Sequence, residues 1–262
     1  MDFSGKAVVV TGGARGVGRG ITRSFLEHGA DVVICGRHEP DELPAVADRS
    51  ASFVPADVRD PEQVAAVVAA TVERHGRLDV LVNNAGGAPF AEAATASPRF
   101  SEKIIQLNLI APLTFAQQAN AVMQSQESGG VIINIASVSA VRPSPGTAAY
   151  GAAKAGLLSL TQSLAVEWAP KVRVTAVTAG MVKTEQAHLH YGDEDGIAAV
   201  SATVPLGRLA EPADVGDACL FLASPLASYV SGADLLLHGG GERPAFLDAA
   251  INANHDNIKK GE

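Results

Sequence analysis

Short apolar runs alternate with stretches of helical periodicity along most of the chain. The apolar runs, rich in Val, Ile and Leu, predict strands. They cover residues 7–10, 31–35, 52–54, 80–82, 131–135, 172–177 and 235–237. Between them, apolar residues that recur about every three to four positions predict helices. These cover residues 16–28, 61–75, 100–126, 148–168 and 211–223.

This alternation also predicts how the elements assemble. Strands that are apolar on both faces and alternate with helices form parallel sheets covered on both sides. We therefore expect an α/β fold: a single-domain, Rossmann-type, doubly wound sheet of about seven strands, predominantly parallel, with helices on both faces. No linker or internal repeat divides the chain, so residues 1–262 are expected to form one domain.

Two segments interrupt the alternation. Residues 181–205 connect the sixth predicted strand to the next helix, and we expect them to close over a ligand as a lid. Within this segment, Asp193–Asp195 is an acidic run of the kind that caps a helix. Residues 241–262 form a polar tail, which either frays or lies across a neighbouring subunit.

Composition narrows the class of protein. The chain has 262 residues, 47% of them hydrophobic, which is enough to bury a large core. No apolar run approaches the length of a transmembrane helix, and the N-terminus lacks the pattern of a secretory signal. A formal net charge of −8 argues against general nucleic-acid binding. Cys35 and Cys219 lie far apart in apolar surroundings and are expected to be reduced thiols, so we expect a cytoplasmic protein.

A glycine-rich turn, Thr11–Gly18, follows the first predicted strand and precedes the first predicted helix. Its glycines allow a close backbone approach to a ligand, and the N-terminus of the following helix offers free N–H groups to an anion. The spacing Gly-x-x-x-Gly-x-Gly differs from the Gly-x-Gly-x-x-Gly dinucleotide fingerprint. We expect a nucleotide to bind here; the alternative is a turn that binds nothing.

The end of the second predicted strand, Cys35-Gly36-Arg37, bears on which nucleotide binds. An acidic residue there would hydrogen-bond the ribose 2′-hydroxyl of NAD, whereas an arginine accommodates the 2′-phosphate of NADP. Gly36 supplies no carboxylate, and Arg37 together with Arg15 could clamp a phosphate. We expect NADP(H) to be preferred, with NAD(H) as the alternative. The other interpretation of Arg37 is an ordinary solvated charge.

Tyr150 and Lys154 lie four positions apart within the predicted helix 148–168. Residues at this spacing share a helix face, and an ammonium beside a phenol stabilises the phenolate. Such a tyrosine can act as a general acid or base near neutral pH. Taken alone, such a pair is more commonly an ordinary surface contact. The motifs upstream of it are what favour a catalytic role for Tyr150 and Lys154.

Together the motifs resemble the short-chain dehydrogenase/reductase family in its single-domain form, over about residues 5–241. The turn Thr11–Gly18 is similar to the family's cofactor turn, and Asn83–Gly86 is similar to its Asn-Asn-Ala-Gly motif. Asp57 looks like the family's adenine contact. The catalytic tetrad of the family is matched by Asn108, Ser137, Tyr150 and Lys154. The chain is also similar to 3-oxoacyl-carrier reductases, a resemblance that many relatives share.

The resemblance implies cofactor-binding positions beyond the turn. They are Thr11, Gly12, Arg15, Gly16, Val17, Gly18, Arg37, Asp57, Val58, Asn84, Ala85, Gly86, Tyr150, Lys154, Gly180, Val182 and Thr184. One position departs from the family, because Ala179 stands where a proline usually precedes Gly180. Proline would fix φ there, so its absence bears on the rigidity of the loop that faces the nicotinamide. Thr184 is still expected to contact the carboxamide.

The resemblance also implies hydride transfer between a nicotinamide and a ketone or secondary alcohol. Tyr150 would be the general acid or base, and Ser137 would hydrogen-bond the reacting oxygen. Lys154 would lower the pKa of Tyr150 and bind the ribose, and Asn108 would hold a water that links Lys154 to solvent. From local context alone, Ser137 is a loop hydroxyl, Asn108 an amide inside a helix and Asp57 a turn residue.

The sequence also bears on the substrate and on the partners of the protein. Val138, Val141 and Met181 would flank the reacting carbon and suggest a largely apolar substrate, such as a 3-oxoacyl thioester or a steroid-like ketone. His188 and His190 are expected to be polar residues of the lid, with no metal bound. Members of the family usually form homodimers or homotetramers, and we expect one of these here. Neither a nucleic acid nor a membrane is an expected partner.

Two other functions stay open. One is a nucleotide-binding sensor or partner-binding protein without turnover. The other is an enzyme that uses Ser137 and Tyr150 for elimination or isomerisation instead of redox chemistry. A net oxidation or reduction of added cofactor would separate the expected oxidoreductase from both.

Overall fold

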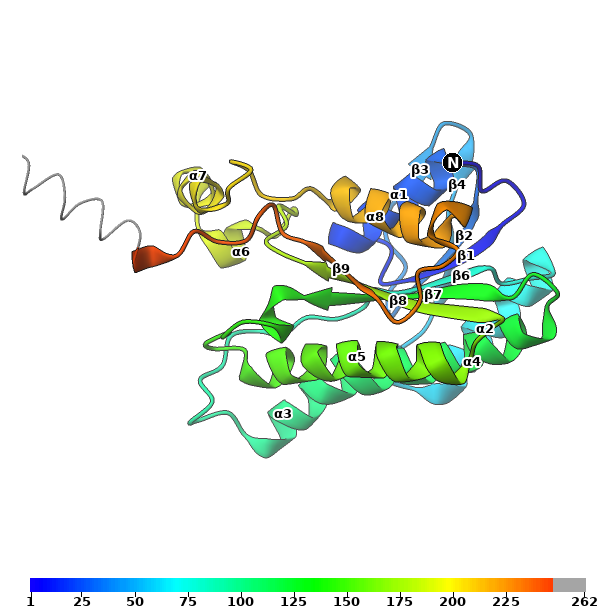
Figure 1. Ribbon diagram of the computed structural model, residues 1–262, viewed down its shortest axis with the longest axis horizontal. Helices are drawn as coiled ribbons and strands as arrows, with labels where there is room; N and C mark the ends of the chain where they lie inside the picture. The colour runs from blue at the N-terminus through cyan, green and yellow to red at the C-terminus, as the bar shows by residue number, and fades with distance from the viewer. Residues whose placement is uncertain (247–262) are drawn as a thin grey trace, which may run out of the picture.

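Seven parallel strands form the central sheet of the protein, in a computed structural model that describes residues 1–246 (Figure 1). They are β1 (Ala7–Thr11), β2 (Asp31–Gly36), β5 (Ser52–Pro55), β6 (Val80–Asn83), β7 (Gly130–Ser137), β8 (Val172–Ala179) and β9 (Asp234–Leu237). Their order across the sheet is β5-β2-β1-β6-β7-β8-β9, and every neighbouring pair is parallel. The predicted fold class and each predicted strand are therefore confirmed.

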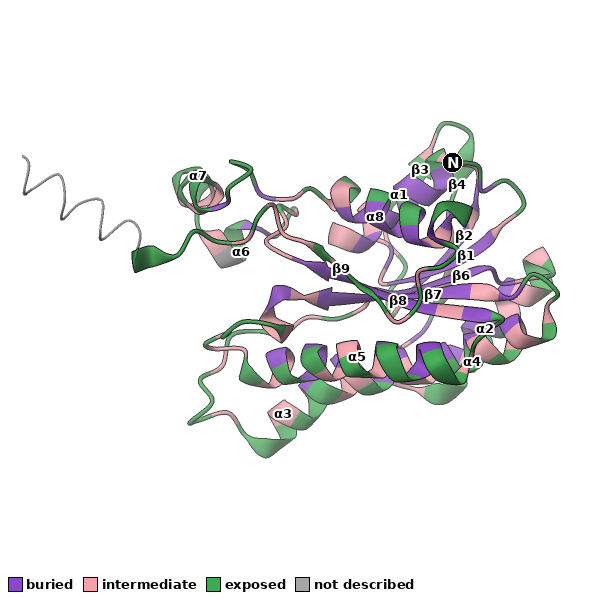
Figure 2. Ribbon diagram, viewed as in Figure 1, coloured by how far each residue is buried: buried purple, intermediate pink, exposed green. Residues whose placement is uncertain are grey.

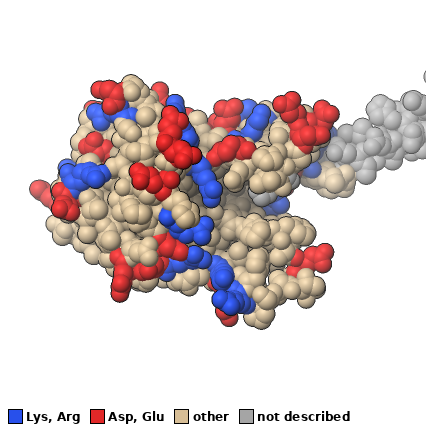
Figure 3. All heavy atoms as spheres, turned by 180° about the vertical axis from the view of Figure 1, so that it is seen from behind, with Lys and Arg blue, Asp and Glu red and all other residues tan. Residues whose placement is uncertain are grey.

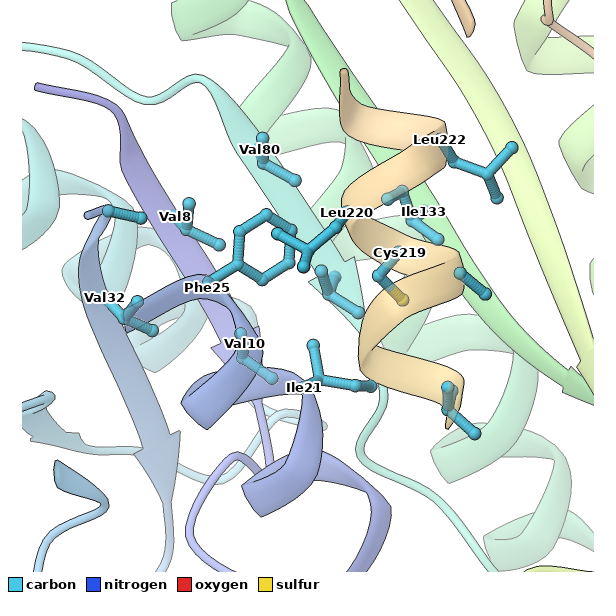
Figure 4. Packing of buried hydrophobic residues seen from close by; sticks show 14 of the residues in the cluster. Val8, Val10, Ile21, Phe25, Val32, Val80, Ile133, Cys219, Leu220 and Leu222 are labelled. Atoms are coloured by element: carbon cyan, nitrogen blue, oxygen red, sulfur yellow. The ribbon is translucent and has the colours of Figure 1, made fainter. Parts of the chain in front are cut away.

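Helices cover both faces of this sheet. On one face lie α1 (Gly16–Glu27) and α8 (Pro212–Ala223); on the other lie α2 (Pro61–His75), α4 (Ala111–Ser125) and α5 (Ala148–Glu167) (Figures 1 and 2). The alternation of side chains along a strand divides the core in two. Val8 and Val10 of β1 pack with Phe25 of α1 and Leu220 of α8 (Figure 4), whereas Val9 belongs to the core on the other face.

The predicted helix 100–126 is the largest departure from expectation. It consists of α3 (Pro98–Ile105), a π-helical turn (Gln106–Ile110) and α4. A π turn inserts one extra residue into a helix and leaves the surrounding apolar spacing nearly intact, so hydrophobic periodicity did not reveal it. The short antiparallel pair β3 (Ala45–Val46) and β4 (Arg49–Ser50) was also not predicted, because two-residue strands carry no periodic pattern.

Residues 181–205 contain α6 (His188–Tyr191) and α7 (Glu194–Thr203). Asp193 is the N-cap of α7 and accepts a hydrogen bond from the Gly196 N–H at 3.0 Å, which confirms the predicted capping role of the acidic run. Short 3₁₀ turns lie at Val138–Ala140 and Pro225–Ala227. Of the predicted tail 241–262, residues 247–262 lie outside the part of the chain that the structure describes.

The order of the strands determines where a ligand can bind. The chain runs outward from β1 to β2 and β5, then returns to β6 on the other side of β1. The two connections diverge at this reversal and leave a crevice at the carboxyl ends of β1 and β6. The glycine-rich turn and the Asn83–Gly86 motif both start at these strand ends.

The surface is mixed in charge. Acidic and basic side chains are interspersed over the face in Figure 3, which is hollowed near its centre. Within residues 1–246, no helix is both long enough and apolar enough to cross a membrane.

Candidate active site

The turn after β1 is shaped for a close approach of another group. Gly16 has φ +53°, in the region that favours glycine. A Cβ on Gly18 would lie 2.3 Å from the Gly12 carbonyl oxygen and 2.5 Å from Asn84 Nδ2, so no side chain fits there. The N-cap of α1, Arg15, gives no side-chain hydrogen bond, and the first turn of α1 has no acidic residue. The turn therefore offers N–H groups that its own neighbouring side chains leave open.

Thr11 and Asn84 join the ends of β1 and β6 at the reversal. The Thr11 hydroxyl oxygen accepts hydrogen bonds from the N–H groups of Asn84 and Ala85, both at 2.9 Å. In return, Asn84 Nδ2 donates to the Thr11 carbonyl oxygen at 2.8 Å. These bonds hold the glycine-rich turn and the Asn-Asn-Ala-Gly motif as one unit. The resulting backbone cradle fits a dinucleotide, with its phosphates at the open N–H groups of α1.

The predicted adenine side of the site lies beyond β2 and β5. Asp57 is held by Arg59, whose Nε and Nη2 donate to its two carboxylate oxygens at 2.9 and 2.5 Å. These bonds lower the pKa of Asp57 to about 2, and the nearby charge of Arg37 contributes to the shift. Val58, next along the chain, is buried. That Asp57 and Val58 contact an adenine stays a prediction.

Arg15 and Arg37 stand at the same edge of the sheet. Arg15 precedes α1, Arg37 directly follows β2, and both are exposed. Neither guanidinium forms a hydrogen bond or an ion pair with the side chains and backbone that the structure describes. That the two charges bind a phosphate stays a prediction.

Three of the four predicted catalytic side chains converge at the ends of β7 and α5. Ser137 is the last residue of β7, and Tyr150 and Lys154 lie in the first two turns of α5. The Ser137 hydroxyl is near enough to the Tyr150 phenol to lower its pKa through a hydrogen bond. Lys154 Nζ donates to the Ile135 carbonyl oxygen at 2.7 Å and lies 5.7 Å from the centroid of the Tyr150 ring.

Burial dominates the electrostatics of this group. Burial raises the pKa of Tyr150 above its ordinary value of 10.0, and the Ser137 hydrogen bond offsets only part of that rise. Burial also lowers the pKa of Lys154 to about 8. Burial therefore outweighs the polar partners of Tyr150, and the lowering of its pKa by Lys154 stays a prediction. The ammonium stands over the ring and is itself only weakly held in its charged form, so desolvation of the phenol prevails.

Asn108 lies in the π turn and is fully buried. Its Oδ1 accepts the Gly87 N–H at 2.8 Å, and its Nδ2 donates to the carbonyl oxygens of Gly87 and Ile104, both at 2.9 Å. A Cβ on Gly86 would lie 2.6 Å from Asn108 Oδ1 and 3.4 Å from Lys154 Nζ. Asn108 therefore ties the Asn-Asn-Ala-Gly loop to the π turn beside Lys154. Its predicted water-holding role stays a prediction.

The loop after β8 is held in place without the proline that the family resemblance leads one to expect at Ala179. Gly180 N–H donates to the Leu237 carbonyl oxygen at 2.8 Å, and a parallel bridge joins Val182 to Ala210. In that bridge, Lys183 N–H donates to the Ala210 carbonyl oxygen at 2.7 Å. These backbone bonds supply the rigidity that the absence of proline at Ala179 puts in question.

Several contacts around the site were not predicted from the sequence. The Ser144 hydroxyl lies 3.0 Å from that of Ser139 and 2.6 Å from that of Thr147, which orders the loop between Ser137 and Tyr150. Arg142 in that loop forms a 2.6 Å ion pair with Glu242. A pocket of about 70 Å³ adjoins Tyr150. It is lined mainly by small side chains and includes Ala88, Ala91, Ala93, Ala96, Phe100 and Ile104. Long-range contacts of this kind leave no local signal in a sequence.

Metal ligation finds no geometric support among the described residues. Leaving aside His190 and residues 247–262, no three His, Cys, Asp or Glu side chains gather closely enough to hold an ion.

Comparison with known proteins identifies the family. A family model described as Enoyl-(Acyl carrier protein) reductase matches residues 12–242, which contain nearly all of the cofactor turn and the whole tetrad. The chain belongs to the short-chain dehydrogenase/reductase family. It is an NAD(P)-dependent dehydrogenase that acts on CH–OH groups.

Similar members of the short-chain dehydrogenase/reductase family differ in substrate. The 3alpha-hydroxysteroid dehydrogenase of Mediterraneibacter gnavus is 35% identical over 247 residues, covering 91% of this chain and 98% of the relative. The L-rhamnose 1-dehydrogenase (NAD(P)(+)) of Azotobacter vinelandii is 39% identical over 246 residues, covering 90% and 96%. The ligand-free structure of Thermoplasma acidophilum aldohexose dehydrogenase has a TM-score of 0.83 and 31% identity, covering 90% and 93%.

Replacing Asn108 tests the clamp in the π turn. We expect Asn108→Leu to lower the free energy of unfolding by about 1–3 kcal/mol, because the part-buried Gly87 groups and the buried Ile104 carbonyl lose their partner, and to reduce kcat. Asn120→Leu, in the regular part of α4, is the control and should change either quantity little. Urea unfolding and steady-state rates check this. An Asn108 variant as stable and as active as the wild type would contradict the clamp.

Replacing Lys154 tests its buried charge. Its folded pKa of about 8 lies below the ordinary 10.5. Between these pH values the unfolded chain binds more protons, so wild-type stability rises with pH. We expect Lys154→Met to be inactive and, at pH 7, more stable by about 1–3 kcal/mol, because an isolated buried charge is costly.

The stability gap between Lys154→Met and the wild type should narrow as pH rises to 10. Urea unfolding at both pH values measures it, with the exposed Lys103→Met as control. A gap that is absent at pH 7, or constant with pH, would contradict the lowered pKa.

Proposed function

We propose that the protein is an NADP(H)-dependent oxidoreductase that interconverts a secondary alcohol and a ketone, with Tyr150 as general acid and base. The observation that carries the proposal is the convergence of Ser137, Tyr150 and Lys154 beside the Asn-Asn-Ala-Gly loop. The catalytic and cofactor residues that the sequence predicts fit this function position by position.

A bound nicotinamide would supply the hydride chemistry. The Tyr150 hydroxyl would move a proton to or from the reacting oxygen, and the Ser137 hydroxyl would hydrogen-bond that oxygen as charge develops on it. Lys154, held on the Ile135 carbonyl oxygen, places a cation beside the phenol. Because burial alone raises the Tyr150 pKa, these polar partners must offset desolvation for the phenol to exchange its proton near neutral pH.

For the substrate, we propose a ring-shaped secondary alcohol of the sugar or steroid type. Relatives of this length are named for a 3α-hydroxysteroid, for L-rhamnose and for aldohexoses. The pocket beside Tyr150, with its small apolar side chains, would receive a small apolar group next to the reacting carbon. Thr147 lines this pocket, and its hydroxyl lies 2.6 Å from that of Ser144, so the pocket also offers hydrogen-bonding capacity.

The proposal extends to the segment after β8 and to the assembly of the chain. Residues 181–205 would form a lid over the substrate, since α6 and α7 follow the loop at Gly180–Thr184. We propose a cytoplasmic homodimer or homotetramer. Apolar side chains left exposed in the single chain support assembly: Val166 on α5, Leu226 and Tyr229 after α8, and Leu236 on β9.

Tyr150→Phe tests the mechanism. The variant should bind NADPH as the wild type does and lose kcat by about a thousandfold, because the proton-transfer group is absent. Absorbance at 340 nm with L-rhamnose, aldohexoses, 3α-hydroxysteroids and 3-oxoacyl thioesters measures turnover. Near-normal activity in the variant would refute the role of Tyr150. Tight cofactor binding without any wild-type turnover would favour the sensor function.

Gly36→Asp tests the cofactor preference. A Cβ at Gly36 meets only the Phe53 ring at 3.7 Å and the His38 carbonyl oxygen at 3.9 Å, so the new side chain fits. Its carboxylate would repel the 2′-phosphate and bind the ribose hydroxyls. We expect the NADPH-to-NADH ratio of kcat/KM to fall at least about tenfold. Gly36→Asn is the uncharged control. A wild type that prefers NADH would overturn the proposed preference.

A further inference from the structure

One contact joins the segment after β8 to the phosphate-binding turn. Glu185 Oε1 accepts a hydrogen bond from the Gly16 N–H at 2.8 Å, across 169 positions of sequence. Gly16 is the first residue of α1, and Glu185 directly follows Thr184. Glu185 is exposed, so this bond is its main tie to the rest of the molecule.

The Gly16 N–H is a strong place for an anion. It belongs to the open first turn of α1, where neither Arg15 nor any acidic residue supplies a cap. By contrast, α2 is capped within its own sequence by Asp60, which accepts from the N–H groups of its first turn. The carboxylate of Glu185 therefore provides from a distance the negative charge that α1 lacks locally.

The Thr184 side chain is close as well. A Cβ built on Gly16 would lie 3.7 Å from the Thr184 Cγ2 atom, within ordinary van der Waals contact. The side chains of Thr184 and Glu185 thus both lie against the turn. A dinucleotide phosphate seated on the α1 N–H groups would need the space and the hydrogen-bond donor that Glu185 uses.

We propose that Glu185 is an internal competitor for the cofactor phosphate and so sets the affinity of the enzyme for its cofactor. This rests on the proposed function, since it assumes that a dinucleotide binds at α1. In the cofactor-free chain, the carboxylate occupies the Gly16 N–H and holds the segment on the turn. Binding of the cofactor requires that this bond break, so the apparent dissociation constant equals the intrinsic constant divided by the fraction of molecules in which the bond is open.

The competition concerns a part of the ligand that both nicotinamide cofactors share. The pyrophosphate is common to NADPH and NADH, whereas the groups near Gly36 and Arg37 distinguish the two. Loss of the Glu185 charge should therefore strengthen both cofactors by the same factor. That pattern separates Glu185 from any residue that acts on the 2′-phosphate.

The experiment is cofactor binding to the full-length chain by calorimetry, with no substrate present. Glu185→Gln and Glu185→Ala should lower the dissociation constants of NADPH and NADH by about threefold to tenfold, the range expected for losing one exposed, charge-assisted competitor. Their ratio should stay constant. Glu194→Gln, which removes another exposed carboxylate of the same segment, is the control and should leave both values unchanged.

Hydrogen exchange at the Gly16 amide tests the proposed bond directly, without relying on cofactor affinity. In the absence of cofactor, hydrogen exchange at the Gly16 amide should be faster in Glu185→Ala than in the wild type, because the amide loses its acceptor. Unchanged or weaker binding in both Glu185 variants, or unchanged exchange at Gly16, would overturn the proposal while leaving the proposed function intact. A wild type that binds neither cofactor would overturn both.

Discussion

The hydrogen bonds between Thr11 and Asn84 join the carboxyl ends of β1 and β6, and the geometry of the whole site depends on this junction. The chain reverses direction across the sheet between β1 and β6, and only there do two strand connections part at the same edge. The Thr11 hydroxyl accepts from the N–H groups of Asn84 and Ala85 and so gives the Ala85 N–H a partner where the connections part. The cofactor turn and the loop clamped by Asn108 thereby keep one geometry.

Much of the fold and the order of the site motifs could be predicted because they depend on local patterns. Strands buried on both faces give continuous apolar runs, and parallel strands must present their carboxyl ends at one edge. Ser137, Tyr150 and Lys154 were predicted together because their order and spacing resemble the family's catalytic motif, whereas local context alone leaves Ser137 a loop hydroxyl. The structure brings these three together as expected.

The parts that could not be predicted depend on three-dimensional context. The pKa of Tyr150 follows from how deeply the phenol is buried, which four-residue spacing does not report. The backbone bonds that steady the loop at Gly180 come from Leu237 and Ala210, both distant in sequence. The contact of Glu185 with Gly16 likewise joins two segments that share no pattern.

The π turn has a consequence for how this site can change over time. Each residue added to or removed from a helix rotates everything beyond it by about 100°. The additional residue at Gln106–Ile110 therefore sets the phase between α3 and α4, while turning Asn108 inward to Gly87. A single-residue deletion there would restore regular helical bonding and yet swing α3 out of register with α5. The length of this stretch, and not only the identity of its side chains, is therefore part of what places Asn108 at the site.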